Sequence, residues 1–452
     1  MTTKVLLAKQ HSLKSEIIKA LRLSYPIVVA QLGIIAMGIA DTMMVGQIGA
    51  TELAAASLGS GLHFLVVCIG IGLTSVISPM IAQANATKDY GLISRILLAG
   101  LYASTILSIL ISFVHIILTY FIFNLGQEVE VATLAQSYLY VITFGVFPLI
   151  IFLAARNFTD GLSYTKIAMY ITFGGLILNI FLNWLFIFGN WGFPRWGLFG
   201  AGVATAITRV MMMVAILWYI FTQENFKKYL SNFSFSNIDK QLVNKINSLG
   251  FPAGLQYFFE IGCFSIAALM SGWLGKYPLA SHQVVINLAS ATYMVTTGIG
   301  AAGSILVGEG IGQKNKKYIF RSALISLGLA SIFMVLMSIL FLVFQSFWVG
   351  LYSTDKKVLE IAMGLLLIAC LFQLSDGIQC VGLSILKGIE DVKIPTIITL
   401  VAYWIIGLPS AYLFAFTFQL GVYGIWYGLC LGLTASATLL NIRFFYLLKY
   451  KI

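Results

Sequence analysis

The sequence predicts an all-α integral membrane protein with twelve transmembrane helices in two six-helix bundles, and three observations lead to this fold class. The mean hydropathy is +0.95 and only 10% of the residues are charged, whereas charged residues make up about 25% of a typical soluble domain. Apolar segments long enough to cross a bilayer recur along the whole chain. The second half also repeats landmark residues of the first half at nearly constant spacing.

Each expected span is an apolar run of at least the ~20 residues that a bilayer crossing requires, bounded by polar residues. The first six runs are 20–45, 53–79, 92–122, 132–155, 165–189 and 198–222. The second six are 248–273, 279–309, 318–346, 359–384, 394–418 and 421–447. We therefore expect an N-terminal six-helix lobe over 1–222, a cytoplasmic linker over 223–247 and a C-terminal six-helix lobe over 248–452.

The internal repeat is visible in short motifs. Leu23-Ser24-Tyr25-Pro26 returns as Leu249-Gly250-Phe251-Pro252, and Asp160-Gly161 corresponds to Lys387-Gly388. Six spans in each copy return the chain to its starting side, so the copies share one orientation and their pseudo-twofold axis runs along the membrane normal. Repeats in a polytopic chain are typical of transporters that rock two halves about a central site.

The net charge of +11 could indicate nucleic-acid binding, but the positions of the charges favour a topology signal instead. Nearly all basic residues precede the first span, follow the last, or fall at the ends of the even-numbered spans. The exceptions are Arg195, Lys276, Lys356, Lys357 and Arg209. The positive-inside rule then places both termini in the cytoplasm. We expect the lipid bilayer, and no nucleic acid, as the partner of this surface.

The sequence shows no motif for catalysis or for a bound cofactor. All five cysteines fall inside expected spans without metal-ligand spacing. No Walker A loop, metalloprotease helix or nucleophile elbow occurs. The basic N-terminus runs directly into a full-length span, which does not match a cleavable signal peptide. We therefore expect neither an enzyme nor a cofactor.

Three carboxylates, those of Asp41, Glu260 and Asp376, fall within apolar runs. An ionised carboxylate in the bilayer core is costly unless it is protonated, paired or hydrated, so each one indicates a functional site. The alternative is a buried ion pair that fixes helix packing, but Arg209 is the only basic residue expected deep in a span. At least two of the acids are then left to hold protons, metal cations or a cationic substrate.

Three further features have both a structural and a functional interpretation. Glu309 lies near the cytoplasmic end of its span, where pairing with Lys314 would make it structural. Pro26 and Pro252 interrupt backbone hydrogen bonding near the cytoplasmic ends of spans one and seven. Each proline marks either an N-terminal helix position or a hinge that bends during transport.

Neutral polar residues in the first lobe accompany Asp41. Asn179 and Asn183 lie four residues apart on one face of the fifth span, and Thr205 lies within the sixth. Their oxygens would suit a hard cation such as Na⁺, and their hydrogens would suit a carboxylate. The alternative for each is a hydrogen bond that only joins two helices.

Five motifs, spread over nearly the whole chain, are specific when they occur together. They are Pro26 with Ala40-Asp41-Thr42-Met43-Met44-Val45-Gly46; Pro252 through Glu260; Ala280-Ser281-His282-Gln283 with Asn287; Gln373-Leu374-Ser375-Asp376 running to Leu386-Lys387-Gly388; and Tyr403-Trp404 with Gly407-Leu408-Pro409. On these motifs the chain resembles the multidrug and toxic compound extrusion (MATE) family, specifically its NorM-like branch. The resemblance implies export of amphipathic, often cationic compounds against inward Na⁺ or H⁺.

The resemblance also implies two ion sites. In the NorM-like branch the C-lobe cation site uses residues that fall on Glu260 and Asp376, and a tyrosine implicated in some members is present as Tyr293. Where some members carry another tyrosine, four residues before the aspartate, this chain has Phe372 and loses one oxygen ligand. The family's N-lobe site falls on four polar residues of this chain: Asp41, Asn179, Asn183 and Thr205. Some relatives have a second aspartate at the position of Asn183.

These features predict a multidrug efflux antiporter, driven by Na⁺ or H⁺ and acting on lipophilic cations as a monomer in a bacterial inner membrane. A flippase for lipid-linked saccharides with the same architecture is the alternative, although its polyanionic substrate would require more basic residues than Arg209. Two repeated bundles with different acids fit a channel less well than alternating access. A membrane-embedded enzyme would need a nucleophile–base or metal constellation that the sequence lacks.

Overall fold

The computed structural model describes residues 13–230 and 238–451, and every regular element in these ranges is a helix. The first half contributes α1 (Leu13–Gly46), α2 (Ala50–Ser75), α3 (Ile77–Ala86), α4 (Tyr90–Phe121), η1 (Ile122–Leu125), α5 (Val129–Phe144), α6 (Val146–Gly161), α7 (Thr165–Phe188), η2 (Asn190–Gly192) and α8 (Gly197–Thr222). The second half contributes α9 (Glu224–Leu230), α10 (Lys240–Trp273), α11 (Lys276–Gly312), α12 (Lys316–Val343), α13 (Gln345–Gly350), α14 (Lys356–Gly388), α15 (Lys393–Leu400), η3 (Val401–Gly407), α16 (Leu408–Tyr412), η4 (Leu413–Thr417) and α17 (Gly421–Tyr450).

The predicted all-α membrane fold is confirmed. Within the described residues, eleven helices are long and apolar enough to cross a membrane, and the pair α5–α6, bent by 44°, makes a twelfth. The expected span 53–79 is built from α2 and α3, which join at Val76. The expected span 394–418 is one continuous helix in which two π-helical segments, η3 and η4, alternate with α15 and α16.

The repeat extends from the sequence to the turns between helices. Asp89 caps the N-terminus of α4, and the matching Asn315 caps that of α12; their side chains accept hydrogen bonds from the backbone N–H groups of Leu92 and Tyr318, at 2.8 and 3.1 Å. Such caps satisfy donors that the first helical turn cannot pair internally. The preceding residues, Lys88 and Lys314, both adopt left-handed backbone, with φ of 58° and 52°.

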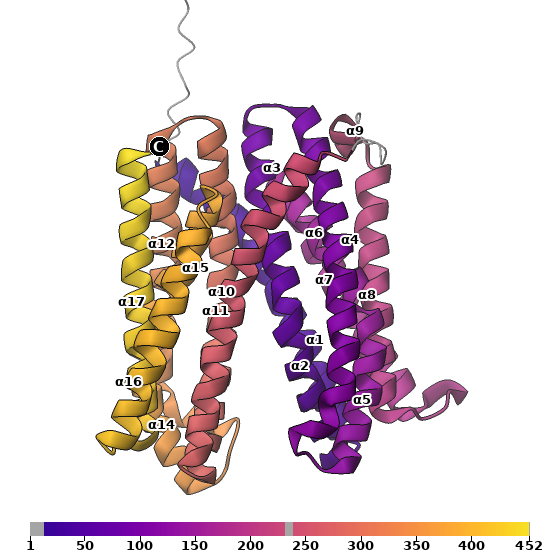
Figure 1. The fold of residues 1–452 in the computed structure, drawn as a ribbon, viewed down its shortest axis with the longest axis vertical. Coiled ribbons are helices and arrows are strands. Elements are labelled where there is room, and N and C mark those ends of the chain that lie inside the picture. The colour runs from indigo at the N-terminus through magenta and orange to yellow at the C-terminus, as the bar shows by residue number, and fades with distance from the viewer. Residues whose placement is uncertain (1–12, 231–237, 452) are drawn as a thin grey trace, which may run out of the picture.

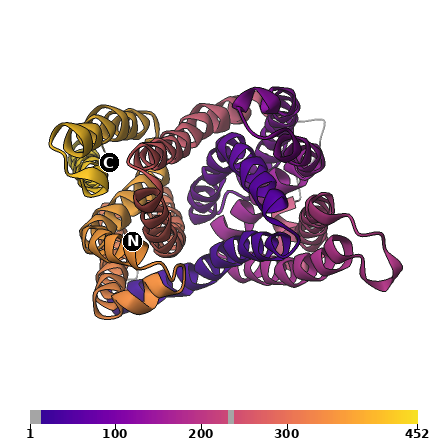
Figure 2. The ribbon, with the colours of Figure 1, turned by 90° about the horizontal axis from the view of Figure 1, so that it is seen from below.

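Figure 1 shows two groups of helices, α1–α8 and α10–α17, which we call the first and second bundles. Seen from below in Figure 2, the bundles lie side by side, and α1 extends from the first bundle along the second. The two bundles meet where α1 and α3 pack on α11 and where α2 and α4 pack on α10. The α2–α10 contact is a backbone contact, because a Cβ added to Gly72 would overlap the backbone of Gly254. Gly250 and Gly254 form the small-xxx-small pattern that allows such close approach in membranes.

The segment between the bundles is shorter than expected. Residues 224–230 form α9, and the seventh span already begins at Lys240, so the residues from 240 to 247 belong to α10 rather than to a linker. Residues 231–237 lie outside the described part of the chain. The lobe boundaries at 222 and 248 remain a prediction.

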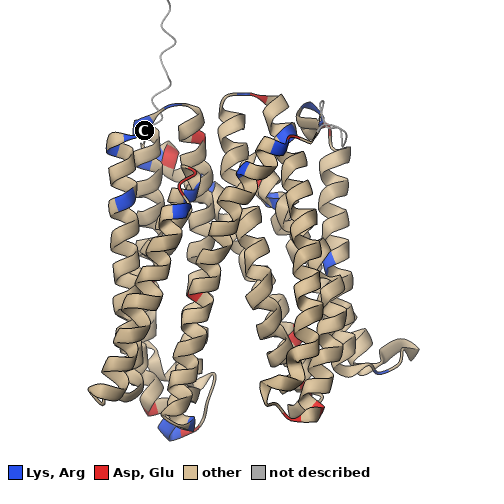
Figure 3. Cartoon of the chain, viewed as in Figure 1, with Lys and Arg blue, Asp and Glu red and all other residues tan. Residues whose placement is uncertain are grey.

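Basic residues gather mainly at one end of the molecule (Figure 3). We call it the basic end; α1 and α10 begin there and α17 finishes there. Lys276, Lys356 and Lys357 lie at the opposite end, at the starts of α11 and α14. This distribution is the one that the sequence analysis used to predict a cytoplasmic face.

Candidate functional site

In the first bundle, the structure brings together the four predicted N-lobe residues, which we call the Asp41 cluster. Asn183 Nδ2 donates to Asp41 Oδ1 at 2.5 Å, and Thr205 Oγ1 donates to Asp41 Oδ2 at 3.0 Å. Asn183 Nδ2 also approaches Asn179 Oδ1 at 3.3 Å, and Asn179 Nδ2 approaches Thr205 Oγ1 at 3.5 Å. The carboxylate is therefore held by neutral donors from α7 and α8, and no described cation lies within ion-pair distance of it.

The surroundings of the Asp41 cluster contain polar residues that the sequence analysis did not assign. Arg209 follows Thr205 by one turn of α8, and its Nη1 is buried without a hydrogen-bond partner. The rings of His63 and His115 lie with their centroids 4.9 Å apart and are tilted by 46°, and none of their nitrogens has a partner among the described residues. A single histidine in an apolar run, without an obvious partner in sequence, gives no signal for such a pair.

In the second bundle, Glu260 and Tyr293 are in direct contact. Tyr293 Oη donates to Glu260 Oε2 at 3.2 Å. Glu260 is 6% exposed and Asp376 is 3% exposed, and the two carboxylates are close enough to interact electrostatically. Asp376 has no hydrogen bond to any described residue. Two carboxylates that share a buried site do not both stay ionised without a proton or a cation between them.

The aromatic surroundings of Glu260 explain the position of Phe372. Its ring packs between Phe264 and Trp426, at centroid distances of 6.0 and 5.4 Å. Phe372 therefore acts as part of the core of this bundle. Tyr403, on the π-helical segment η3, is buried with its Oη lacking a hydrogen-bond partner, and it interacts electrostatically with both Glu260 and Asp376. Tyr403 belongs to one of the five sequence motifs, but it was not predicted as a site residue.

This group, Glu260, Tyr293, Asp376 and Tyr403, which we call the Glu260 cluster, offers only oxygen ligands. Oxygen ligands suit hard cations such as Na⁺ and protons rather than soft transition metals. The described residues contain no group of three or more histidine, cysteine or acidic side chains that could hold a metal ion.

The two clusters lie at different depths. Asp41 precedes the end of α1 by five residues and Glu260 precedes the end of α10 by thirteen, which corresponds to about 8 and 20 Å from the helix ends opposite the basic end. The clusters are therefore separate sites in separate bundles.

Besides Arg209, which was expected deep in a span, the structure buries two further cations near the basic ends of helices. Arg156 in α6 is buried and pairs with Asp160 at 3.4 Å, one turn along the same helix. Lys387 lies in the last turn of α14 and is also buried. Both had been assigned to junctions, because α6 and α14 continue past the expected spans 132–155 and 359–384.

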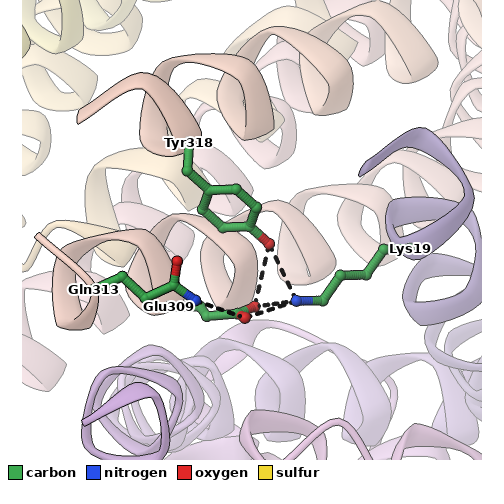
Figure 4. Close-up of polar contacts among 4 residues, drawn as sticks. All are labelled: Lys19, Glu309, Gln313 and Tyr318. Atoms are coloured by element: carbon green, nitrogen blue, oxygen red, sulfur yellow. Dashed lines mark hydrogen bonds and ion pairs between the residues drawn. The ribbon is translucent and has the colours of Figure 1, made fainter. Parts of the chain in front are cut away.

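Glu309 is paired, as its structural interpretation requires, but its partner is Lys19 of the other bundle and not Lys314. Lys19 Nζ donates to Glu309 Oε1 at 2.7 Å and to Oε2 at 2.5 Å (Figure 4). Tyr318 Oη and Gln313 Nε2 donate to the same carboxylate at 3.2 and 3.1 Å. We call these four residues the Lys19–Glu309 cluster; Lys19, Glu309 and Gln313 line a cavity of about 230 Å³ between the bundles.

Other polar contacts between the bundles lie at the same end. Arg321 pairs with Glu16 at 3.5 Å, and Gln83 Nε2 donates to the carbonyl oxygen of Gly388 at 3.3 Å. Among the described residues, every hydrogen bond or ion pair that joins the two bundles lies at the basic end. The contacts therefore hold the bundles together at this end and leave their opposite ends without polar links.

Pro26 and Pro252 lie inside their helices. Pro26 is thirteen residues into α1 and Pro252 twelve residues into α10, so neither occupies an N-terminal helix position. The carbonyl oxygen of Pro252 accepts a hydrogen bond from Thr396 Oγ1 at 3.0 Å. This contact ties the interrupted part of α10 to α15.

The twelve spans of the described residues lie in two repeated bundles, each with an acidic cluster among its helices, and this arrangement defines a membrane transporter. The MatE family model matches the chain twice, over residues 26–185 and 252–413. The chain belongs to this family, in its NorM-like branch. It is 34% identical over 95% of its length to the probable multidrug resistance protein NorM of Rhizobium meliloti (strain 1021), of which it covers 93%.

Further relatives and solved structures agree with this assignment. The chain is 32% identical to the multidrug resistance protein NorM of Aliivibrio fischeri (strain ATCC 700601 / ES114), covering 97% of this chain and 96% of that one. A structure described as the outward-facing conformation of a multidrug resistance MATE family transporter matches with a TM-score of 0.88 at 20% identity, covering 97% and 96% of the two chains. The eukaryotic MATE transporter AtDTX14 matches with a TM-score of 0.87 at 19% identity, covering 96% of each chain. These two structures support the fold.

Proposed function

We propose that this chain is a multidrug efflux antiporter that exports amphipathic, cationic compounds in exchange for Na⁺ or H⁺ by alternating access. The observation that carries the proposal is that three carboxylates within the two bundles, those of Asp41, Glu260 and Asp376, form no ion pair with a described cation. Such a carboxylate is stabilised by whichever cation reaches it, so a driving ion and a cationic drug compete for the same charge. This competition is the coupling between the two ligands.

The two clusters have different roles in this proposal. Glu260, Asp376 and Tyr293 bind the driving cation, and Tyr403 offers an additional oxygen. Asp41, with Asn179, Asn183 and Thr205, links protonation to a rearrangement of the first bundle. Pro26 and Pro252 act as hinges, because each interrupts the backbone hydrogen bonding of a helix that packs against the other bundle.

The names of the relatives and the distribution of basic residues support a membrane location and an orientation. Bacterial relatives at 32–34% identity are named as multidrug resistance proteins, which supports drug export at a bacterial inner membrane. The basic end faces the cytoplasm with both termini, in accordance with the positive-inside rule. The polar contacts between the bundles lie at that end, so the described arrangement is the one closed to the cytoplasm. The chain works as a monomer.

Transport of lipid-linked saccharides is the competing function. A cavity for polyanionic headgroups would require several free basic side chains, whereas the Asp41 and Glu260 clusters are acidic. The names of the relatives also favour drug export. Scrambling of fluorescent lipid headgroups by the purified protein in vesicles, without efflux of cationic dyes, would favour the flippase.

The direct test uses vesicles that contain the purified protein and are loaded with ethidium. An inward Na⁺ gradient and an inward H⁺ gradient are imposed separately, and at least one should accelerate ethidium efflux several-fold over no gradient. Ethidium binding without a response to either gradient would contradict antiport.

A second test concerns the Glu260 cluster. Glu260→Gln and Asp376→Asn should each weaken Na⁺ binding and impair efflux. Because both acids would serve one site, the double variant should be scarcely worse than either single variant. Additive losses would show that the two carboxylates bind separate ions.

A further inference from the structure

Lys387 is a buried cation that forms no salt bridge within the described part of the chain. Its side chain is in the last turn of α14, and the residue is 8% exposed. Its Nζ lies 5.4 Å from the centroid of the Tyr257 ring. A cation over an aromatic face recovers only part of the hydration that burial removes. The ammonium therefore needs a counter-charge that its immediate neighbours do not supply.

The internal repeat also indicates that Lys387 has no counter-charge one turn away on its own helix. Lys387 occupies the position that corresponds to Asp160 in the first copy, where the carboxylate pairs with Arg156 one turn away. The residue that corresponds to Arg156 in the second copy is Leu383. The second copy thus carries the opposite charge at this position and lacks the local partner. Its counter-charge has to come from another helix.

Helix geometry directs Lys387 toward the Glu260 cluster. Asp376 and Lys387 are eleven residues apart on α14, which is close to three full turns, so both lie on one face. On α10, Tyr257 precedes Glu260 by three residues on one face, toward the basic end. Lys387 therefore approaches Glu260 from the basic end, and its charge already interacts with the Glu260 carboxylate. One turn of α10, about 5 Å, separates the level of Tyr257 from that of Glu260.

We propose that Lys387 is a tethered cation that competes with the transported cation for Glu260 and Asp376. In the described arrangement its ammonium rests on Tyr257, and the carboxylates are free to take up a cation. When the basic end opens, the flexible lysine side chain extends by one turn to Glu260 and displaces the ion from the two carboxylates. Lys387 thereby sets how tightly the site binds its ion and how readily it releases it. This inference rests on the proposed antiport.

The proposal predicts effects of opposite sign for two substitutions. Lys387→Gln removes the competing charge and should tighten Na⁺ binding about tenfold, the usual effect of one nearby charge on a buried carboxylate. Tyr257→Leu removes the aromatic surface that holds the ammonium away from Glu260 and should weaken Na⁺ binding. Lys387→Arg keeps the charge and should bind Na⁺ nearly as the wild type does. If Lys387 had only a structural role, the two substitutions would not change the Na⁺ affinity in opposite directions.

The measurement is equilibrium binding of radioactive Na⁺ to the purified full-length protein at fixed pH. The pH midpoint of ethidium binding is recorded in parallel, because a site that takes H⁺ instead of Na⁺ should show the same effect there, moved about one pH unit upward in Lys387→Gln. Lys393→Gln, which removes an exposed cation at the start of α15, is the matched control. If Lys387→Gln loses its fold by thermal unfolding, Tyr257→Leu still tests the proposal.

The proposal is supported if Lys387→Gln binds Na⁺ more tightly or raises the pH midpoint of ethidium binding. Neither change should occur in Lys387→Arg or Lys393→Gln. Unchanged Na⁺ binding and an unchanged midpoint in both Lys387→Gln and Tyr257→Leu would overturn it. Failure of the antiport itself looks different, because the wild-type protein would then show no gradient-driven efflux. Failure of this inference alone leaves wild-type coupling intact.

Discussion

Glu309→Gln should shift the protein away from the arrangement that is closed at the basic end. The substitution keeps the size of the side chain and leaves an oxygen for Tyr318, but it removes the charge that Lys19 contacts through both carboxylate oxygens. The side chains of Lys19 and Glu309 are 41% and 23% exposed. At such exposure solvent screening reduces an ion pair to about 1 kcal/mol.

This energy fixes the expected size of the effect. Because the pair joins the two bundles, its loss acts directly on the equilibrium between closed and open basic ends. A change of about 1 kcal/mol corresponds to about a fivefold change in the ratio of the two populations. High ionic strength should produce a similar shift in the wild type, because 1 M salt shortens the screening length to about 3 Å. Potassium chloride is the suitable salt, since it leaves Na⁺ out of the experiment.

Electron–electron distance measurements between spin labels can follow the two populations. Labels on exposed positions at the basic ends of the two bundles, Thr87→Cys and Lys317→Cys, report the separation of α3 from α12. Cys370 and Cys430, which are only half-buried, are replaced by serine so that they do not react. The longer-distance population should grow about fivefold relative to the shorter one in Glu309→Gln.

Glu224→Gln is the matched control for this experiment. Glu224 pairs with Lys227 within α9, both side chains are largely exposed, and the pair does not join the bundles. Its loss should leave the distance distribution unchanged. The reasoning would be refuted if Glu309→Gln had no effect on the distances, or if the control had the same effect.

Three further outcomes follow from the structure. Asp41→Asn should leave the thermal unfolding temperature within a few degrees of the wild type, because neutral donors already surround the group. It should nevertheless reduce gradient-driven ethidium efflux at least tenfold. Efflux at the wild-type rate would show that Asp41 is a packing residue. Phe372→Tyr should tighten Na⁺ binding about fivefold, the effect of about 1 kcal/mol from one added oxygen, and unchanged binding by equilibrium dialysis would show that the hydroxyl does not reach the ion. Gly72→Ala should lower the unfolding temperature, because its Cβ overlaps the backbone of Gly254 and overpacking costs about 1–3 kcal/mol; an unchanged temperature would mean that α2 and α10 separate freely.

The fold could be predicted from the sequence because its signals are local or periodic. Apolar runs mark the spans, and the repeat marks the two bundles without any knowledge of contacts. The boundaries were less accurate at the basic end, because helices such as α10 and α14 continue for several residues beyond the apolar core. Charged residues in those extensions were therefore read as loop residues, and this is why Lys387 was assigned to a junction.

The candidate sites were predictable only in part. The spacing of Asn179 and Asn183 on one face, together with the family resemblance, led to the Asp41 cluster. In contrast, Lys19 and Glu309 are 290 residues apart in the chain, and no local pattern links them. Tyr403 was missed for another reason. It lies on a π-helical segment, where the turn is wider than in an α-helix, so helical periodicity does not report the direction of its side chain.

The close approach of Gly72 and Gly254 is one of the points where the backbones of the two bundles touch, and it divides α10 into two arms of unequal length. Gly254 divides α10 into fourteen residues toward the basic end and nineteen toward the other end, or about 21 and 28 Å. A rotation of about 15°, comparable to known subunit rotations, would move these helix ends by about 5 and 7 Å. A displacement of that size exceeds the reach of any hydrogen bond, so the Lys19–Glu309 contact would be either complete or absent. A full rotation of this size would therefore be enough to separate the carboxylate of Glu309 from the ammonium of Lys19.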